Sequence, residues 1–148
     1  MVDSINSNQL PHDDQVNRLQ ALTALEFYSG IGGMRFALEG AVDDPRAVKV
    51  LAAFDINPHA NQVYLHNFGD AVTSANLDNT MNADKLGRFK ADIYLMSPPC
   101  QPYTRTGHQN QAADPRSKSF LAFLEALPIL DANNKAPKYL FIEKCPRI

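Results

Sequence analysis

The sequence predicts an α/β protein with a mostly parallel sheet. Short apolar runs alternate with stretches of helical periodicity, which is the pattern of βαβ units. Four of the apolar runs are followed directly by glycine-rich or polar residues, as expected where parallel strands end at one edge of a sheet. The 148 residues suffice for one domain. We expect a folded unit over residues 21–148, preceded by a disordered, polar extension over residues 1–20.

In the first half of the chain, two predicted strands are each followed by a helix. The strands are Thr23–Tyr28 and Val48–Phe54, and the helices begin at Met34–Leu38 and at Pro58 with Ala60–Phe68. A glycine-rich turn over residues 29–33 separates the first pair, and Asp55 ends the second strand. Pro58 suits the first helical turn, because the N–H that proline lacks would have no partner there.

The second half contains one ambiguous stretch and two clear strands. Over residues 71–90 we expect a short strand at Ala71–Ser74 and a turn or short helix at Asn82–Leu86. Ala91–Met96 predicts a strand that stops at Ser97-Pro98-Pro99, because proline cannot donate to a strand ladder. A polar loop follows, then a helix over Ser117–Leu127 that Pro128 breaks. The last predicted strand, Lys138–Ile142, should be buried up to Glu143.

Charge and cysteine content narrow the function classes. The 14 Lys and Arg residues are outnumbered by 16 Asp and Glu residues, so no global basic field would hold a nucleic acid. A polyanionic partner must therefore be bound by a local patch. The two cysteines and the lack of a secretory signal favour free thiols in a soluble protein that is cytoplasmic and/or nuclear. No apolar run approaches the roughly 20 residues of a membrane span, and we expect no membrane segment and no metal site.

The glycine turn and Asp55 form the first candidate site. Gly30, Gly32 and Gly33 permit positive φ and close backbone approach, and the helix beyond offers free N–H groups to an anion. Arg35 occupies the third glycine position of a dinucleotide motif, which weakens a dehydrogenase interpretation. Asp55 ends the second strand, where an acid accepts hydrogen bonds from ribose hydroxyls. Together they predict a nucleotide-like cofactor; a plain tight turn and a helix-capping aspartate are the alternatives.

Cys100 is the candidate nucleophile. The two prolines before it fix φ twice and remove two donors, which gives a stiff platform at the end of a strand. The thiolate is the reactive form, and nearby cations would favour it and could also bind phosphates. These cations are Arg105, His108, Arg116 and Lys118. The alternative for Cys100 is a small, buried hydrophobic residue, and the alternative for the cations is a solvated charged loop. Glu143 is a candidate acid at the same edge.

These motifs resemble those of the S-adenosylmethionine-dependent cytosine-C5 methyltransferases, and especially the eukaryotic branch that methylates a cytosine in the anticodon loop of aspartate tRNA. The segments that carry the resemblance are Phe27-Tyr28-Ser29-Gly30-Ile31-Gly32-Gly33-Met34, Asp55-Ile56-Asn57, Pro98-Pro99-Cys100-Gln101-Pro102-Tyr103-Thr104-Arg105 and Asp114-Pro115-Arg116-Ser117. The residues after the cysteine are similar to the tRNA branch rather than to the bacterial DNA enzymes. An adenine-amino methyltransferase would need an aromatic residue in place of Cys100.

The resemblance implies a Rossmann-like methyltransferase fold, S-adenosylmethionine as cofactor and covalent catalysis. Cys100 would add to C6 of cytosine, and Glu143 would hydrogen-bond N3 and the amino group of the base. Implied cofactor contacts are Phe27, Tyr28, Ser29, Gly30, Ile31, Gly32, Gly33, Met34, Asp55, Ile56, Asn76, Leu77, Ser97 and Pro98. Implied nucleic-acid contacts are Gln101, Thr104, Arg105 and Arg116. Transfer RNA is the expected partner, and DNA is the alternative.

The resemblance runs from about Leu25 to Glu143 and then stops, because Lys144-Cys145 stands where relatives have Asn-Val. The later strands and the target-recognition region of the family have no counterpart here. We expect a sheet that stops after about the fifth strand, with an open apolar edge at Lys138–Ile142. We also expect weak or no activity from this chain by itself. A truncated isoform or gene-model fragment that binds only cofactor or nucleic acid is the alternative.

Overall fold

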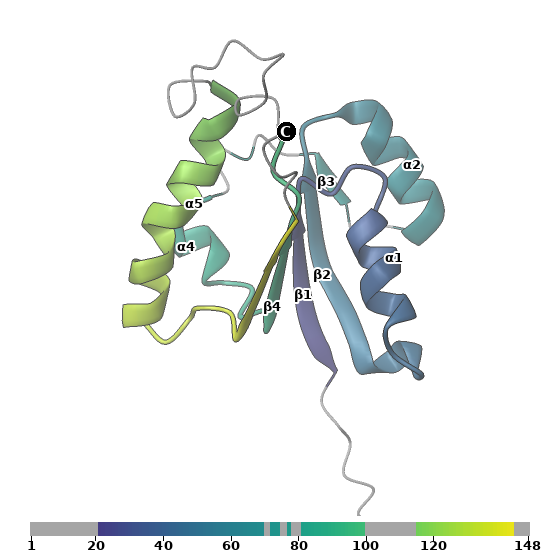
Figure 1. The fold of residues 1–148 in the computed structure, drawn as a ribbon, viewed down its shortest axis with the longest axis horizontal. Coiled ribbons are helices and arrows are strands. Elements are labelled where there is room, and N and C mark those ends of the chain that lie inside the picture. The colour runs from purple at the N-terminus through teal and green to yellow at the C-terminus, as the bar shows by residue number, and fades with distance from the viewer. Residues whose placement is uncertain (1–20, 70–71, 75–76, 78–80, 100–114, 144–148) are drawn as a thin grey trace, which may run out of the picture.

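The computed structural model describes residues 21–69, 72–74, 77, 81–99 and 115–143. They form a parallel five-stranded sheet with helices on both faces (Figure 1). The elements are β1 Leu22–Phe27, α1 Gly33–Gly40, a 3-10 turn at Pro45–Ala47, β2 Val48–Asp55, α2 Pro58–Phe68, β3 Val72–Ser74, α4 Ala83–Leu86, β4 Ile93–Met96, α5 Pro115–Ala132 and β5 Tyr139–Ile142. The predicted α/β class and parallel sheet are confirmed.

The order of the strands places a topological switch at the centre of the sheet. The order is β3-β2-β1-β4-β5, so the chain builds outward from β1 in one direction and then returns to add β4 on its other side. Helices α1 and α2 cover one face, and α4 and α5 cover the other (Figure 1). Ligands of such sheets bind beyond the carboxyl ends of the strands at the switch point, which here lies between β1 and β4.

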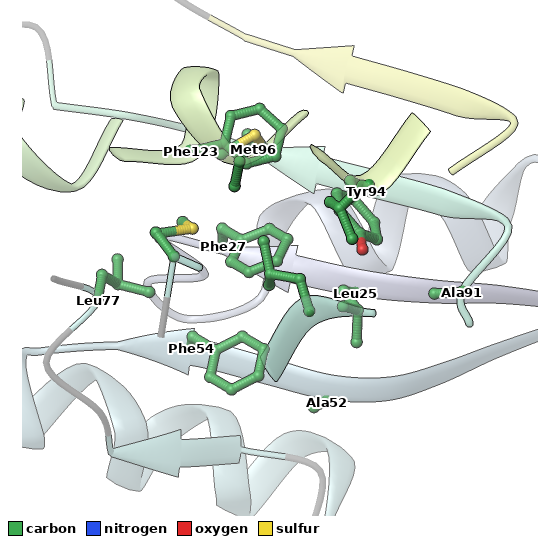
Figure 2. Close-up of a cluster of buried hydrophobic side chains, with 13 residues drawn as sticks. Leu25, Phe27, Ala52, Phe54, Leu77, Ala91, Tyr94, Met96 and Phe123 are labelled. Atoms are coloured by element: carbon green, nitrogen blue, oxygen red, sulfur yellow. The ribbon is translucent and has the colours of Figure 1, made fainter. Parts of the chain in front are cut away.

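The main core lies between the sheet and α5. Phe27 stacks on Phe54 with ring centroids 5.3 Å apart and meets the edge of Tyr94 at 5.4 Å (Figure 2). Phe123 of α5 is fully buried against the same group. Each burial of an aromatic side chain of this size contributes about 1.5–3 kcal/mol. Packing of these aromatic rings in the core therefore supports the strand ends that carry the candidate site residues.

Helix α2 begins where the sequence predicts, and its cap explains why. The side chain of Asn57 accepts hydrogen bonds from the N–H groups of His59 and Ala60 at 3.0 and 3.4 Å, and Pro58 occupies the first turn. An asparagine cap of this kind stabilises a helix by about 1 kcal/mol. Because Asn57 provides the cap, the alternative that Asp55 is a helix-capping residue is wrong.

Helix α5 does not break at Pro128, which corrects the prediction that it ends at Leu127. It runs from Pro115 to Ala132, with Pro128 inside it. Phe123, Ala126 and Leu130 are buried on one side of this helix, so packing continues past the proline. Pro128 removes one backbone hydrogen bond of the helix, and the burial of Leu130 beyond it helps to offset this loss.

Strand β5 is exposed, which corrects the prediction that it is buried up to Glu143. Its four side chains, Tyr139 to Ile142, are 58%, 41%, 57% and 38% exposed. Among the described residues β5 pairs with β4 alone, so one edge carries unpaired backbone groups beside apolar side chains. The expected open apolar edge is confirmed. Within the described part of the chain, no helix is both long and apolar enough to cross a membrane.

We expect the open edge to drive self-association of the 148-residue chain, and Phe141→Thr to weaken it. Phe141 is 57% exposed on β5, and its burial between copies would contribute about 1.5–3 kcal/mol. The substitution should therefore raise the concentration of half-association about tenfold or more, as measured by sedimentation velocity. Ile129→Thr is the control, because Ile129 is 54% exposed on a helix. Equal association of both variants and the parent would contradict this role of the edge.

Asp92 ties β4 to the beginning of β1 and to β5. Its carboxylate accepts hydrogen bonds from the backbone N–H and hydroxyl of Thr23 at 3.0 and 2.7 Å and pairs with Lys138 at 2.8 Å. Lys138 and Thr23 hold the pKa of this carboxyl well below its usual value. The ionised carboxylate therefore stabilises the fold above about pH 4, and this contribution is lost as the pH falls toward the folded pKa.

Asp92→Asn should consequently lower the stability at pH 7 and make the fall in stability below about pH 4 shallower. The measurement is the free energy of unfolding in urea at a series of pH values from 7 to 3. Asp43→Asn, which removes an exposed carboxylate, is the control. Parallel stability curves for the parent and Asp92→Asn would contradict the assignment.

Candidate cofactor site at the carboxyl edge of the sheet

Backbone hydrogen bonds join the four strand ends that carry the predicted site residues. The N–H of Ser29 donates to Phe54 O at 3.2 Å, that of Ser97 to Phe27 O at 3.2 Å, and that of Glu143 to Met96 O at 2.9 Å. Each bond continues the pairing of neighbouring strands just past their ends. The glycine turn, Asp55, the start of the Ser97-Pro98-Pro99 segment and Glu143 thus lie side by side along one edge.

The backbone is left-handed at one position just before the glycine turn and at two positions within it. The φ angles are 56° at Tyr28, 52° at Gly30 and 96° at Gly32, and the N–H of Gly32 donates to Ser29 O at 2.8 Å. Glycine adopts such angles without strain, whereas a tyrosine does so at a cost of order 1 kcal/mol or more. The turn thus connects the end of β1 to the start of α1.

Asp55 connects the glycine turn to the segment that leads into α2. Its Oδ2 accepts a hydrogen bond from the N–H of Gly30 at 2.8 Å, and its Oδ1 accepts one from the N–H of Asn57 at 2.8 Å. Two carboxylate oxygens offer about four acceptor positions, so capacity for further donors such as ribose hydroxyls remains. Asp55 is half-buried, and Asn61 donates to its backbone carbonyl at 3.1 Å.

The surroundings of Asp55 suit a ligand with both polar and apolar parts. Ile31 and Ile56 expose 57% and 68% of their surface. A Cβ placed on Gly30 or Gly33 would meet no atom within 4 Å, so space is open beside the turn. The hydroxyl of Ser29 is buried and has no hydrogen-bond partner among the described residues. These features fit a nucleotide-like cofactor. Its hydrogen-bond donors would pair with the remaining acceptors, and its apolar ring would cover the exposed isoleucine side chains.

Several predicted cofactor residues are buried in the core and support the site by packing. Phe27 is fully buried in the core, and Met34 packs against the smaller cluster on the α1 face. Leu77 is 5% exposed and lies on the Phe27 and Phe54 side of the core, away from Leu25 and Ala52 (Figure 2). Pro98 is buried, and Ser97 is half-buried. The side chains of Phe27 and Leu77 therefore contribute packing to the edge.

Some of the predicted site residues lie outside the part of the chain that the structure describes. Asn76, Cys100, Gln101, Thr104 and Arg105 lie outside the described residues, and Arg116 lies in the first turn of α5. Glu143 is exposed directly after β5. In the described ranges, no group of three or more His, Cys, Asp or Glu side chains is arranged as a metal site would require.

A buried carboxylate behind the turn escaped the sequence analysis. Glu26 is 1% exposed and accepts hydrogen bonds from the hydroxyl of Tyr64 at 2.8 Å and the N–H of Arg35 at 3.2 Å. Burial raises its pKa above the usual value. Since Gly32 has no side chain with which to cap α1, Glu26 supplies the acceptor from β1. Its signal in the sequence is a single acid between Leu25 and Phe27 in an apolar strand, which must be paired if buried.

Residues 22–148 match the protein family described as C-5 cytosine-specific DNA methylase. The chain belongs to this family. It is 42% identical over 125 residues to the tRNA (cytosine(38)-C(5))-methyltransferase of Bos taurus and 41% identical over 122 residues to that of Schizosaccharomyces pombe. These matches cover 84% and 82% of this chain but 30% and 35% of the relatives. The chain thus spans about a third of the length of these cytosine methylases.

Solved structures of methyltransferases share the fold. The crystal structure of S. pombe Dnmt2 methyltransferase superimposes with a TM-score of 0.68 at 38% identity, covering 84% of this chain and 34% of that one. The structure of the Entamoeba histolytica methyltransferase EhMeth gives 0.71 at 35% identity, covering 85% and 38%. The predicted methyltransferase fold is confirmed. Membership of the family implies S-adenosylmethionine as the cofactor.

Proposed function

We propose that this chain binds S-adenosylmethionine at the carboxyl edge beside β1 and β2 and supplies the nucleophile that methylates C5 of a cytosine in tRNA. The observation that carries the proposal is the set of backbone bonds joining Ser29, Ser97 and Glu143 to neighbouring strand ends. These bonds bring the glycine turn, the strand end before Cys100 and Glu143 to one edge, which supports the roles proposed for them. The relatives named as tRNA (cytosine(38)-C(5))-methyltransferases favour tRNA over DNA.

The residues around Asp55 divide the recognition of the cofactor among them. Asp55 accepts hydrogen bonds from the ribose hydroxyls with the acceptor positions that Gly30 and Asn57 leave free. Ile56 packs against the adenine ring, since its exposed surface would otherwise remain in water. The hydroxyl of Ser29 and the open side of the glycine turn face the methionine part. When bound, the cofactor supplies an electrophilic methyl group on a sulfonium.

Covalent catalysis is assigned from the family motif, because Cys100 lies outside the described residues. The Cys100 thiolate adds to C6 of the cytosine, and the added electron density makes C5 nucleophilic enough to take the methyl group. Loss of the C5 proton to a base then expels the thiolate and leaves 5-methylcytosine. Glu143 hydrogen-bonds N3 and the amino group of the base and so stabilises the adduct.

Binding of tRNA requires a local basic patch, because the net charge of the chain is −2. Arg105 and Arg116 are the proposed phosphate ligands, and Gln101 and Thr104 the proposed contacts to the target nucleotide. The cytosine must leave any base stack to reach a nucleophile at the sheet edge, which an unpaired loop of RNA allows at low cost.

The test is transfer of labelled methyl from S-adenosylmethionine to tRNA under single-turnover conditions, with the protein in excess so that slow transfer is detected. We expect label in tRNA but little in duplex DNA, loss of transfer in Cys100→Ala, and retention in Cys145→Ala as the matched control. Label that does not depend on Cys100 would contradict the proposed nucleophile.

Two alternatives are distinguished by this experiment together with a measurement of S-adenosylhomocysteine binding. The similarity to a DNA (cytosine-5)-methyltransferase of Dictyostelium discoideum, 40% identical over 126 residues, favours DNA as the second candidate substrate. Greater transfer to DNA than to tRNA would support it. The second alternative is a chain that binds cofactor without turnover. Binding of S-adenosylhomocysteine without any Cys100-dependent transfer would support that alternative.

A further inference from the structure

Tyr28 and Ser119 connect the cofactor turn to helix α5 across 91 residues of sequence. The phenol oxygen of Tyr28 lies 2.9 Å from the hydroxyl oxygen of Ser119. Ser119 is 6% exposed and Tyr28 is half-buried. A partly buried hydrogen bond of this kind contributes about 0.5–1.5 kcal/mol. The contact is therefore a specific link between the chain at the glycine turn and helix α5.

Phe27 at the end of β1 and Tyr28, which leads into the glycine turn, are hydrogen-bonded to the two flanks of the segment that contains Cys100. On one flank, the N–H of Ser97 donates to the carbonyl of Phe27 at 3.2 Å. On the other flank, Ser119 in α5 pairs with the adjacent residue, Tyr28. The chain just before the turn is thus bonded both to the strand end before residue 100 and to the helix after residue 114.

The backbone of Tyr28 indicates that its side chain is held in place. Its φ of 56° is strained for a residue other than glycine, at a cost of order 1–3 kcal/mol. One helical turn beyond Ser119, the ring of Phe123 lies 6.4 Å from that of Phe27. Residues 119 and 123 share one side of α5, so the hydrogen bond and the ring contact together fix this side of the helix against the end of β1.

We infer that Tyr28 and Ser119 are a positioning pair that couples occupancy of the cofactor turn to the reactivity of Cys100. The inference rests on the proposed function, because it takes the turn as the cofactor site and Cys100 as the nucleophile. The phenol of Tyr28 acts through Ser119 and α5. Cofactor binding restricts the turn, and the pair transmits this restriction to the flank of the Cys100 segment.

The test measures the rate at which iodoacetamide alkylates Cys100 in the full chain carrying Cys145→Ser, with and without saturating S-adenosylhomocysteine. We expect S-adenosylhomocysteine to change this rate at least threefold in the parent. In Tyr28→Phe and in Ser119→Ala, the change should shrink to less than 1.5-fold at ligand concentrations that saturate each variant. The double variant should behave like either single one, because both substitutions remove the same hydrogen bond.

Tyr94→Phe is the matched control. The Tyr94 hydroxyl is buried and has no hydrogen-bond partner among the described residues, so this variant removes an oxygen without breaking a tie. It should keep the full effect of S-adenosylhomocysteine. An undiminished effect in both Tyr28→Phe and Ser119→Ala would overturn the inference. If the ligand binds the parent without altering the alkylation rate, the coupling is refuted and the proposed function stands; if it does not bind, both are refuted.

Discussion

Gly32→Ala is expected to destabilise the protein by about 3 kcal/mol or more, through a clash and a strained backbone together. A Cβ at this position would lie 2.2 Å from Cε2 of Phe68 and 3.1 Å from Cε2 of Tyr64. The ring of Phe68 cannot easily move away, because it packs against Phe36 and Tyr64 at centroid distances of 4.6 and 4.8 Å. The guanidinium carbon of Arg35 also contacts this ring, at 4.4 Å from the Phe68 centroid.

Gly33→Ala provides the control for this prediction. A Cβ on Gly33 meets no atom within 4 Å, and its φ is not in the left-handed region. At a helical position that alanine can adopt, the substitution should be neutral or stabilising by about 0.4–1 kcal/mol. Urea midpoints of the two variants measure the difference. If Gly32→Ala were as stable as Gly33→Ala, the packing of Phe68 against the turn would be refuted.

Glu26→Ala is expected to cost about 3–5 kcal/mol, a large part of the total stability of a domain of this size. The substitution removes the acceptor of the buried Tyr64 hydroxyl and of the Arg35 N–H in the first turn of α1. It also leaves a cavity, because Glu26 is 1% exposed. Both losses fall directly beneath the cofactor turn.

Glu26→Gln keeps the shape of the side chain and removes its charge, so it tests the two contributions separately. The amide oxygen can accept from Arg35 N–H while the amide nitrogen donates to the Tyr64 hydroxyl, which can reverse its role. Because burial already raises the pKa of Glu26, removal of the charge should cost at most about 1 kcal/mol. Equal destabilisation by both substitutions, measured as the free energy of unfolding in urea, would contradict this account.

The strand ends could be predicted from the sequence because strong local signals mark them. β2 ends at Asp55 and β4 at Met96, where an acid or prolines follow buried apolar runs. β1 ends one residue earlier than predicted, since the φ of Tyr28 takes it out of the strand. Parallel topology then brings these ends together without further information.

Partnerships across long sequence separations could not be predicted. Glu26 and Tyr64 are 38 residues apart, and Tyr28 and Ser119 are 91 apart. No local pattern pairs such residues, because their contact depends on how the helices cross the sheet. The continuation of α5 past Pro128 was missed for the same reason, since tertiary packing outweighs the local preference of proline to end a helix.

Calorimetry with S-adenosylhomocysteine tests most directly the claim that the carboxyl edge beside β1 and β2 is the cofactor site. The parent chain should bind one equivalent, and Asp55→Ala should lower the affinity about tenfold or more by removing the acceptor of the ribose hydroxyls. Asp43→Ala, which removes an exposed carboxylate away from this edge, should bind as the parent does. Absence of binding to the folded parent, or equal affinity of Asp55→Ala and the parent, would contradict the assignment of the site.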